Sequence, residues 1–239
     1  MQSPKGVVTK SRQITLAAVF SAVYFVLRVI PTFQMVGVSA YFTAGDFLLT
    51  TIALVAGLWS GSLAVVVGTL TSYAVKPPVF FGLDFLPALA NVSVASFLIS
   101  GRRKSAVGLY VVILAAFLVS PYSLLFGYGG IPYVWLHLIA LAVLLSPISG
   151  RIVLWVNRWD YRGVIAVAAL AFIGTMAQHL VGGILYEFSV GFVGGVTPQH
   201  LMDLWRVIFW LYPTERVVLI VISTLIAVPV YRSYKRFRR

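Results

Sequence analysis

The chain has 239 residues, of which 60% are hydrophobic and only 10% are charged, and its formal net charge is +12. Soluble domains carry roughly 25% charged residues, so this composition excludes a soluble globule. The cations lie in short clusters between apolar runs, a pattern typical of membrane-protein loops rather than of a nucleic-acid-binding surface, so no nucleic-acid partner is expected. Because the sequence contains no cysteine, disulfides and cysteine metal sites are excluded as well.

Apolar runs between charges, prolines and glycines predict an all-α, polytopic membrane helix bundle that forms a single domain over residues 1–239. An N-terminal tail, 1–11, and a basic C-terminal tail, 232–239, flank it. We expect about eight spans, within a range of six to eight, and the candidate helices are 12–30, 45–58, 61–75, 84–100, 105–119, 131–148, 162–187 and 213–232.

The stretch 45–75 could be one long helix or a helical hairpin. Gly57 and Gly61 mark a turn in its middle. With a hairpin, 14 of the 18 Lys and Arg residues fall on one side of the membrane: Lys5, Lys10, Arg12, Arg102, Arg103, Lys104, Arg151, Arg158, Arg162, Arg232, Lys235, Arg236, Arg238 and Arg239. Since positive loops favour the cytoplasmic side, the charges select the hairpin. Both termini are therefore expected to be cytoplasmic, in a protein of the cell membrane.

Thr197 and Pro198 predict the start of a short helix that reaches about Leu211, separate from the last span. Its partly polar face carries His200, Asp203 and Arg206. Two positions fit this pattern: a lid over the outer end of the bundle, or an interfacial helix in the headgroup layer.

Polar and aromatic side chains gather toward the predicted outer ends of the spans. Burying polar groups in hydrocarbon costs several kcal/mol unless they face a cavity or a partner, so the set predicts a substrate pocket. Its members are Arg28, Tyr41, Asp46, Lys76, Asp84, Asn91, Tyr133, Trp135, His137, Gln178, His179 and Glu187. For any one of them, snorkelling to headgroups or membership of an ordinary aromatic belt is the competing explanation.

Four stretches together resemble the substrate-binding S component of energy-coupling factor (ECF) vitamin transporters. They are the first span Ile14–Ala22 ending at Pro31, the Gly45–Asp46 opening of the short-helix pair, the turn Ala56–Gly61, and the closing span from Tyr212–Pro213 to the basic tail. The resemblance implies a vitamin-like substrate bound on the outer side, with an ECF transmembrane coupling subunit and ATPase subunits as partners. It also implies that Ala18 and Ala22, an AxxxA motif, contact the coupling subunit. Common S components have six spans, so two helices would be inserted here, most plausibly within 101–162.

Two other functions compete with transport. The first is a membrane-embedded enzyme that uses Asp46, Asp84, His179 or Glu187, and the second is a structural subunit of a membrane complex. The sequence has no phosphate loop, HExxH, GxSxG or EF-hand motif, so any ATP-driven step needs partner subunits. Its three histidines lie on separate segments and predict no metal site, and no cofactor is expected. The substrate stays open among heteroaromatic molecules such as a flavin, thiamine or a queuosine-type base.

Overall fold

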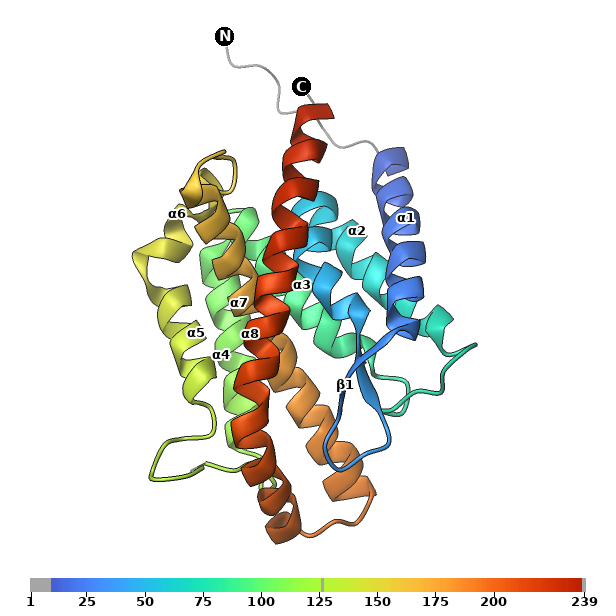
Figure 1. The fold of residues 1–239 in the computed structure, drawn as a ribbon, viewed down its shortest axis with the longest axis vertical. Coiled ribbons are helices and arrows are strands. Elements are labelled where there is room, and N and C mark those ends of the chain that lie inside the picture. The colour runs from blue at the N-terminus through green and yellow to red at the C-terminus, as the bar shows by residue number, and fades with distance from the viewer. Residues whose placement is uncertain (1–9, 126, 238–239) are drawn as a thin grey trace.

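The computed structural model describes residues 10–125 and 127–237, so Lys5, Arg238, Arg239 and the rest of both chain ends lie outside the described residues. Within these ranges the chain forms eight α-helices and one small antiparallel sheet (Figure 1). In chain order the elements are α1 (Lys10–Val29), β1 (Pro31–Gln34), β2 (Tyr41–Thr43), the 3-10 helix η1 (Ala44–Leu48), α2 (Leu49–Ser72), α3 (Phe85–Ile99), α4 (Arg103–Leu118), α5 (Trp135–Leu145), α6 (Pro147–Trp155), α7 (Tyr161–Tyr186), the π-helix η2 (Glu187–Val193) and α8 (Pro198–Phe237).

The helix α2 is broken at Gly57, whose backbone angles, φ 72° and ψ −168°, belong almost solely to glycine. The two halves fold back on each other. A Cβ at Gly61 would lie 3.1 Å from the Ile52 side chain, nine residues earlier, whereas a straight helix would separate these residues by about 13 Å. Gly45 and Gly68 likewise both pack on Tyr24 of α1. The predicted hairpin of two short helices is therefore present.

Four stretches of the described chain are long and apolar enough to cross a membrane: Lys10–Val29, Ala44–Ser72, Tyr161–Val193 and Pro198–Phe237. A fifth is possible if α5 and α6, bent by 65°, count as one span. This is fewer than the six to eight spans predicted. The stretch Ala44–Ser72 reaches its length only with both halves of the hairpin, and α3 and α4, with 15 and 16 residues, fall short of the ~20 that a full crossing needs.

The helix α8 corrects another prediction, because the expected surface helix near 197–211 and the last span form one continuous helix of 40 residues. Pro213 removes a helical hydrogen bond, which usually ends or kinks a helix. Here Phe209, Tyr212 and Arg216 are all buried, so packing against the bundle continues through the proline. The structure thus places 198–211 as the far end of a long helix, with Leu201 and Trp205 buried rather than lying over the bundle as a separate lid.

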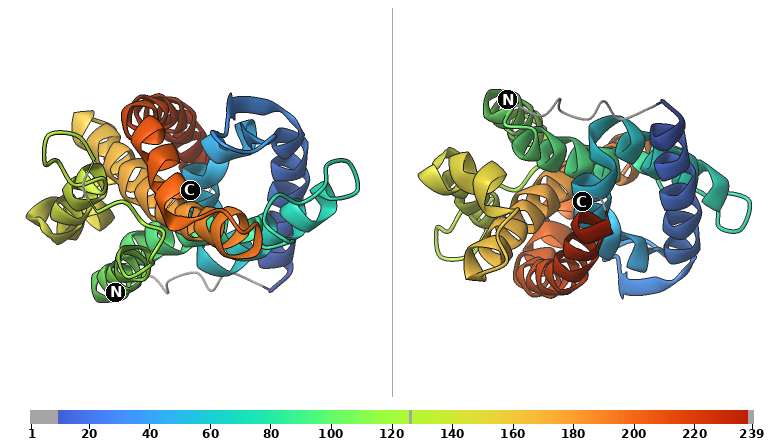
Figure 2. Two further views of the ribbon diagram at one scale, coloured as in Figure 1. Left: turned by 90° about the horizontal axis from the view of Figure 1, so that it is seen from below. Right: turned by 90° about the horizontal axis from the view of Figure 1, so that it is seen from above.

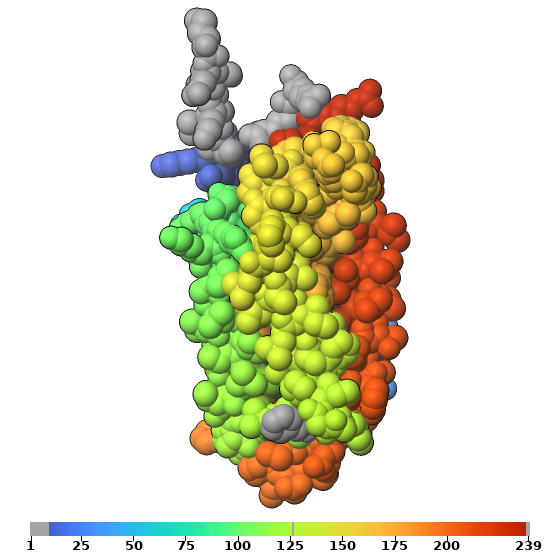
Figure 3. Space-filling model, turned by 90° about the vertical axis from the view of Figure 1, so that its left-hand side faces the viewer, coloured from blue at the N-terminus to red at the C-terminus, as the bar shows by residue number. Residues whose placement is uncertain are grey.

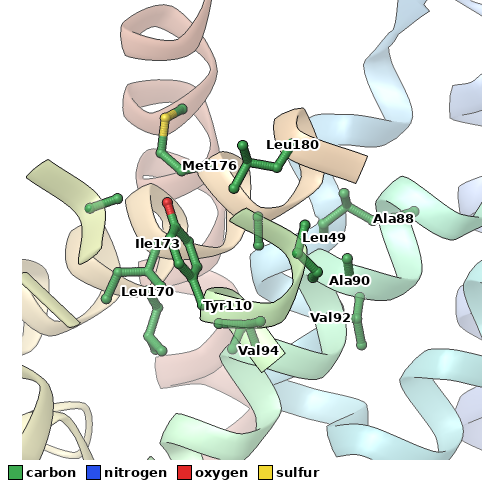
Figure 4. Packing of buried hydrophobic residues seen from close by; sticks show 14 of the residues in the cluster. Leu49, Ala88, Ala90, Val92, Val94, Tyr110, Leu170, Ile173, Met176 and Leu180 are labelled. Carbon is green, nitrogen blue, oxygen red and sulfur yellow. The ribbon is translucent and has the colours of Figure 1, made fainter. Parts of the chain in front are cut away.

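A single apolar core joins the helices. Close packing of α3, α4 and α7 brings together buried side chains such as Val92, Tyr110 and Leu170, which are fully excluded from solvent (Figure 4). The helices α4, α5 and α6 form one flank of the molecule (Figure 3). The predicted helix 131–148 is split at this flank, since Ser146 caps a new helix that begins at Pro147.

The start of α1 and the end of α8 lie at the same end of the bundle (Figure 1). Arg12 donates from Nη2 to the Tyr234 hydroxyl at 2.6 Å, and Arg232 donates to the Trp159 carbonyl at 3.1 Å. Arg103 donates to the carbonyls of Leu144 and Ser146, which ties the beginning of α4 to the junction of α5 and α6. The described members of the predicted cation clusters thus share one end of the fold, here called the basic end.

Candidate functional site

A cavity of about 120 Å³ lies toward the end of the molecule opposite the basic end. Its lining residues come from the end of α1, the β1–β2 hairpin, η1, the loop from α2 to α3 and its two flanks, the last turns of α7 and the first half of α8. Figure 2 shows that α1 and the β1–β2 hairpin lie on the side of the molecule away from α5 and α6. Residues of the lining fall within 28–46, 72–88, 178–186 and 205–216. The flank of α4, α5 and α6 contributes nothing to it among the described residues.

The structure brings most of the predicted site residues to this cavity. Seven of them line it: Arg28, Tyr41, Asp46, Lys76, Asp84, Gln178 and His179. They come from five separate parts of the chain, α1, β2, η1, the loop from α2 to α3, and α7, and sequence spacing alone could not show that these parts converge. The folded-back α2 explains part of this convergence, because it brings Asp46 at its start and Lys76 just beyond its end to the same cavity.

Two further predicted residues stand directly behind the lining. Asn91 donates from Nδ2 to the Gln178 side-chain oxygen at 2.9 Å, and His137 lies with Nε2 3.0 Å from Nδ1 of His179. Both are almost fully buried, with 1% of their surface exposed. They therefore position lining residues rather than face the cavity.

The other three predicted residues do not line the cavity. Tyr133 is buried in an aromatic cluster, with its ring 5.1 Å from that of Trp205 and 5.2 Å from that of Tyr212. Trp135 begins α5 and packs against the apolar core. Glu187 is buried at the start of η2, next to Ser120 and to the lining residue Trp205, but does not itself line the cavity. These residues were predicted because they lie at a similar depth in the membrane to the other site residues, but their side chains do not point into the cavity.

Both acids in the cavity wall already accept protein hydrogen bonds. Asp46 accepts from Gln178 Nε2 at 2.7 Å and from the backbone N–H of Thr43 at 3.3 Å. Asp84 accepts from the backbone N–H groups of Val79 and Phe80, at 2.9 and 3.1 Å, and from the Tyr73 hydroxyl at 3.3 Å. These carboxylates hold the η1 corner and the loop after α2 in place.

The cationic side chains are much less satisfied. Arg216 is 1% exposed, and its Nε and Nη1 have no hydrogen-bond partner within the described structure. Its Nη2 reaches Glu215 only at 3.4 Å, and its guanidinium lies over the Phe42 ring at 4.5 Å. The buried Nε of Arg28 is likewise without a partner in the described part of the chain.

Sequence reasoning missed Arg216 and Glu215 as site residues, although both line the cavity. The signal was present, since charged residues inside an apolar span are rare and usually functional. These two stand just after Pro213, at the predicted start of the last span, and were not included in the predicted pocket. The continuity of α8 instead buries them.

The loop after α2 carries two titratable groups that line the cavity and have shifted pKa values. Burial and the neighbouring Arg28 lower the pKa of the Lys76 amine, against the opposing attraction of Asp84. Burial and the carboxylate of Asp84 raise the pKa of Tyr73 to about 12. The Tyr73 hydroxyl therefore remains a hydrogen-bond donor at neutral pH.

A stack of three rings supports the floor of the site. His137 and His179 are parallel within 7°, with centroids 5.1 Å apart, and the Tyr212 ring stacks on His179 at 5.0 Å. In the contact between the two imidazoles one nitrogen must donate and the other accept, so the accepting ring is neutral there. No group of three or more His, Asp or Glu side chains in 10–125 and 127–237 is placed to hold a metal ion.

Comparison with known proteins gives no relative of this chain. No family model, no curated protein and no solved structure matches it.

Proposed function

We propose that this protein is the membrane-embedded substrate-binding subunit of an ECF-type importer, which captures a small, vitamin-like molecule from outside the cell. The observation that carries the proposal is the cavity itself. Charged and aromatic side chains from six elements surround a space at one end of an apolar helix bundle, and the loops between α1 and η1 and between α2 and α3 form part of its wall. Small-molecule sites have this composition, with a few polar groups placed among apolar ones.

The helix arrangement supports the proposal in a second way. The helical part of the cavity lining comes from six segments, which are α1, η1, the second half of α2, α3, α7 and α8. The flank of α4, α5 and α6 stands apart from it. A six-helix unit with an insertion within 101–162, as the resemblance implies, would have this arrangement.

The outer face of α1 offers a surface for a coupling subunit. Ala18 and Ala22 are exposed, whereas Ala17 and Ser21 on the adjoining face are buried against the bundle. Small side chains four residues apart let a second helix approach closely. The exposed AxxxA motif is therefore available to a partner, because Ala18 and Ala22 are not buried by packing within the described chain.

The charge distribution supports the proposed direction of transport. If the basic end is cytoplasmic, as the positive-inside rule predicts, the cavity lies toward the outer half of the membrane. A substrate would then enter the cavity from outside the cell and contact Arg28, Asp46, Lys76 and Arg216 there. The ATPase and coupling subunits would act at the basic end.

Co-expression with an ECF coupling module tests this function. The tagged chain should co-purify with the transmembrane coupling subunit and its ATPases, and mass spectrometry should find a small molecule retained by the chain alone. A membrane enzyme would instead convert a substrate without these partners. A structural subunit would retain no small molecule. Absence of association with the module, or of a retained small molecule, would contradict the proposed function.

A further inference from the structure

We infer that the molecule bound in this cavity carries an oxyanion, a carboxylate or a phosphate, attached to a planar apolar body. The inference rests on the proposed function, because it names the chemical class of the substrate of that same site. It is drawn from which hydrogen-bonding groups of the cavity wall are already occupied by the protein and which are left free.

Arg216 has buried hydrogen-bond donors that the described part of the protein does not satisfy. A buried guanidinium has five N–H donors, and leaving donors unsatisfied in a low-dielectric interior is costly. Arg216 is 1% exposed and lines the cavity, yet its Nε and Nη1 have no acceptor among the described residues. The adjacent Glu215 takes only one long contact from Nη2. An oxyanion in the cavity would supply the missing acceptors, with the fork geometry that guanidinium groups favour.

Arg28 and Lys76 add positive charge from two other directions. Arg28 enters the cavity from the end of α1, and its buried Nε also lacks a partner in the described part of the chain. Lys76 reaches it from the loop after α2. Three cations on three separate elements therefore converge on one small space.

The acids of the wall do not compete for a cationic ligand in the same way. The lining contains Asp46, Asp84 and Glu215, so its formal charge is balanced. The carboxylate oxygens of Asp46 and Asp84, however, already accept hydrogen bonds from Gln178, Tyr73 and backbone N–H groups. Apart from the Glu215 carboxylate, which Arg216 contacts at 3.4 Å, the charged side chains of the wall offer free donors rather than free acceptors, and these donors favour an acceptor-rich, anionic ligand.

Aromatic rings complete the site. Phe42, Tyr73, Tyr186 and Trp205 line the cavity, and the Phe42 ring already holds the Arg216 guanidinium against its face. A planar ligand body can pack among these rings while its oxyanion reaches the guanidinium groups. A purely inorganic anion would leave this apolar wall uncovered.

Matched pairs of probes test the inference on the full-length chain in detergent. The pairs are nicotinate with nicotinamide, indole-3-acetate with indole-3-acetamide, and phenyl phosphate with phenol, and the readouts are the thermal midpoint and the dissociation constant. At least one acid should bind about tenfold or more tightly than its neutral partner, because charge-assisted hydrogen bonds are lost with the charge. The carboxylate and phosphate members show which oxyanion the site prefers.

Variants locate the effect. Arg216→Gln and Arg28→Gln should remove the preference for the acid, while Arg206→Gln, at an exposed position of the same helix, should leave it unchanged. Since Arg216→Gln leaves Glu215 without its partner, the double variant E215Q/R216Q serves as the folding control. If the double variant folds with the wild-type thermal midpoint and still prefers the acid, the role of Arg216 is wrong.

The outcomes separate this inference from the proposed function. Stronger binding of a neutral or cationic probe, equal binding within every pair, or no binding of any acid would overturn the oxyanion inference. Association with the coupling module is measured on the same preparations. Its loss would contradict the transporter function even if an acid binds, and its presence would leave that function standing if the acid preference fails.

Discussion

Gln178 on α7 donates from Nε2 to Asp46 Oδ1 at 2.7 Å, and so joins two residues that are 132 positions apart in the chain. The same amide accepts a hydrogen bond from Asn91 on α3. Three elements of the cavity wall, η1, α3 and α7, are thus held by one chain of side-chain hydrogen bonds. Such a buried network fixes the wall only while every member keeps its partner.

Replacement of Gln178 by leucine should break this network. The buried carboxylate of Asp46 would lose a donor, and Asn91 would lose its acceptor, at a cost of about 1–3 kcal/mol in stability. We expect a lower thermal midpoint and weaker retention of the co-purified small molecule. Gln199→Leu, which makes the same change at an exposed position, is the control and should alter neither. Equal effects of both variants would show that the network does not hold the wall.

The backbone at Gly57 gives a second prediction. A Cβ there would meet no atom within 4 Å, so Gly57→Ala tests backbone strain alone. The strain of a non-glycine residue in this region is about 1–3 kcal/mol, and it should lower the unfolding midpoint. Gly108→Ala in the exposed face of α4 should instead stabilise the chain by about 0.5–1 kcal/mol, since alanine favours helix. An unchanged midpoint for Gly57→Ala would argue against the break in α2.

The absence of cysteine makes the predicted topology directly measurable. Lys104→Cys lies at the basic end, and Gln199→Cys lies at the start of α8 toward the opposite end, both at exposed positions. A membrane-impermeant maleimide applied to intact cells should label Gln199→Cys and not Lys104→Cys. Lysed cells should label both, which controls for reactivity. The reverse labelling pattern would show that the protein has the opposite orientation in the membrane.

The exposed motif on α1 can be separated from substrate binding. Ala18→Leu and Ala22→Leu add bulk where a coupling subunit is proposed to pack, so transport and co-purification should fall while substrate retention persists. Ala115→Leu places the same bulk on the exposed face of α4 and should change neither. If the α1 variants lose substrate retention as well, the motif supports the fold of this chain instead.

Local patterns predicted those parts of the structure that local chemistry decides. The hairpin followed from Gly57, Gly61 and the distribution of charges, and the clustering of cations at one end followed from their spacing between apolar runs. Arg28, Asp46 and Gln178 were found because polar groups inside apolar helices need partners. Each of these inferences used a rule that operates within a few turns of helix.

The rest depended on packing between distant elements. By local sequence rules, Pro213 indicates the start of a helix. The helix α8 instead continues across Pro213, with Tyr212 and Arg216 buried against the bundle, and Arg216 therefore lines the cavity. Tyr133 and Glu187 have a suitable depth, yet their orientation is set by contacts with α8 and within η2 that no spacing rule describes. The short strands β1 and β2 were not predicted either, although only residues 35–40 separate them.

ATP-dependent uptake into proteoliposomes tests the central claim most directly. The chain is reconstituted with an ECF coupling module, and the small molecule identified by mass spectrometry is supplied outside, with ATP inside the vesicles. We expect accumulation that requires ATP and the coupling module and that is lost with E215Q/R216Q. Accumulation without the coupling module, or none with the complete set of subunits, would contradict it.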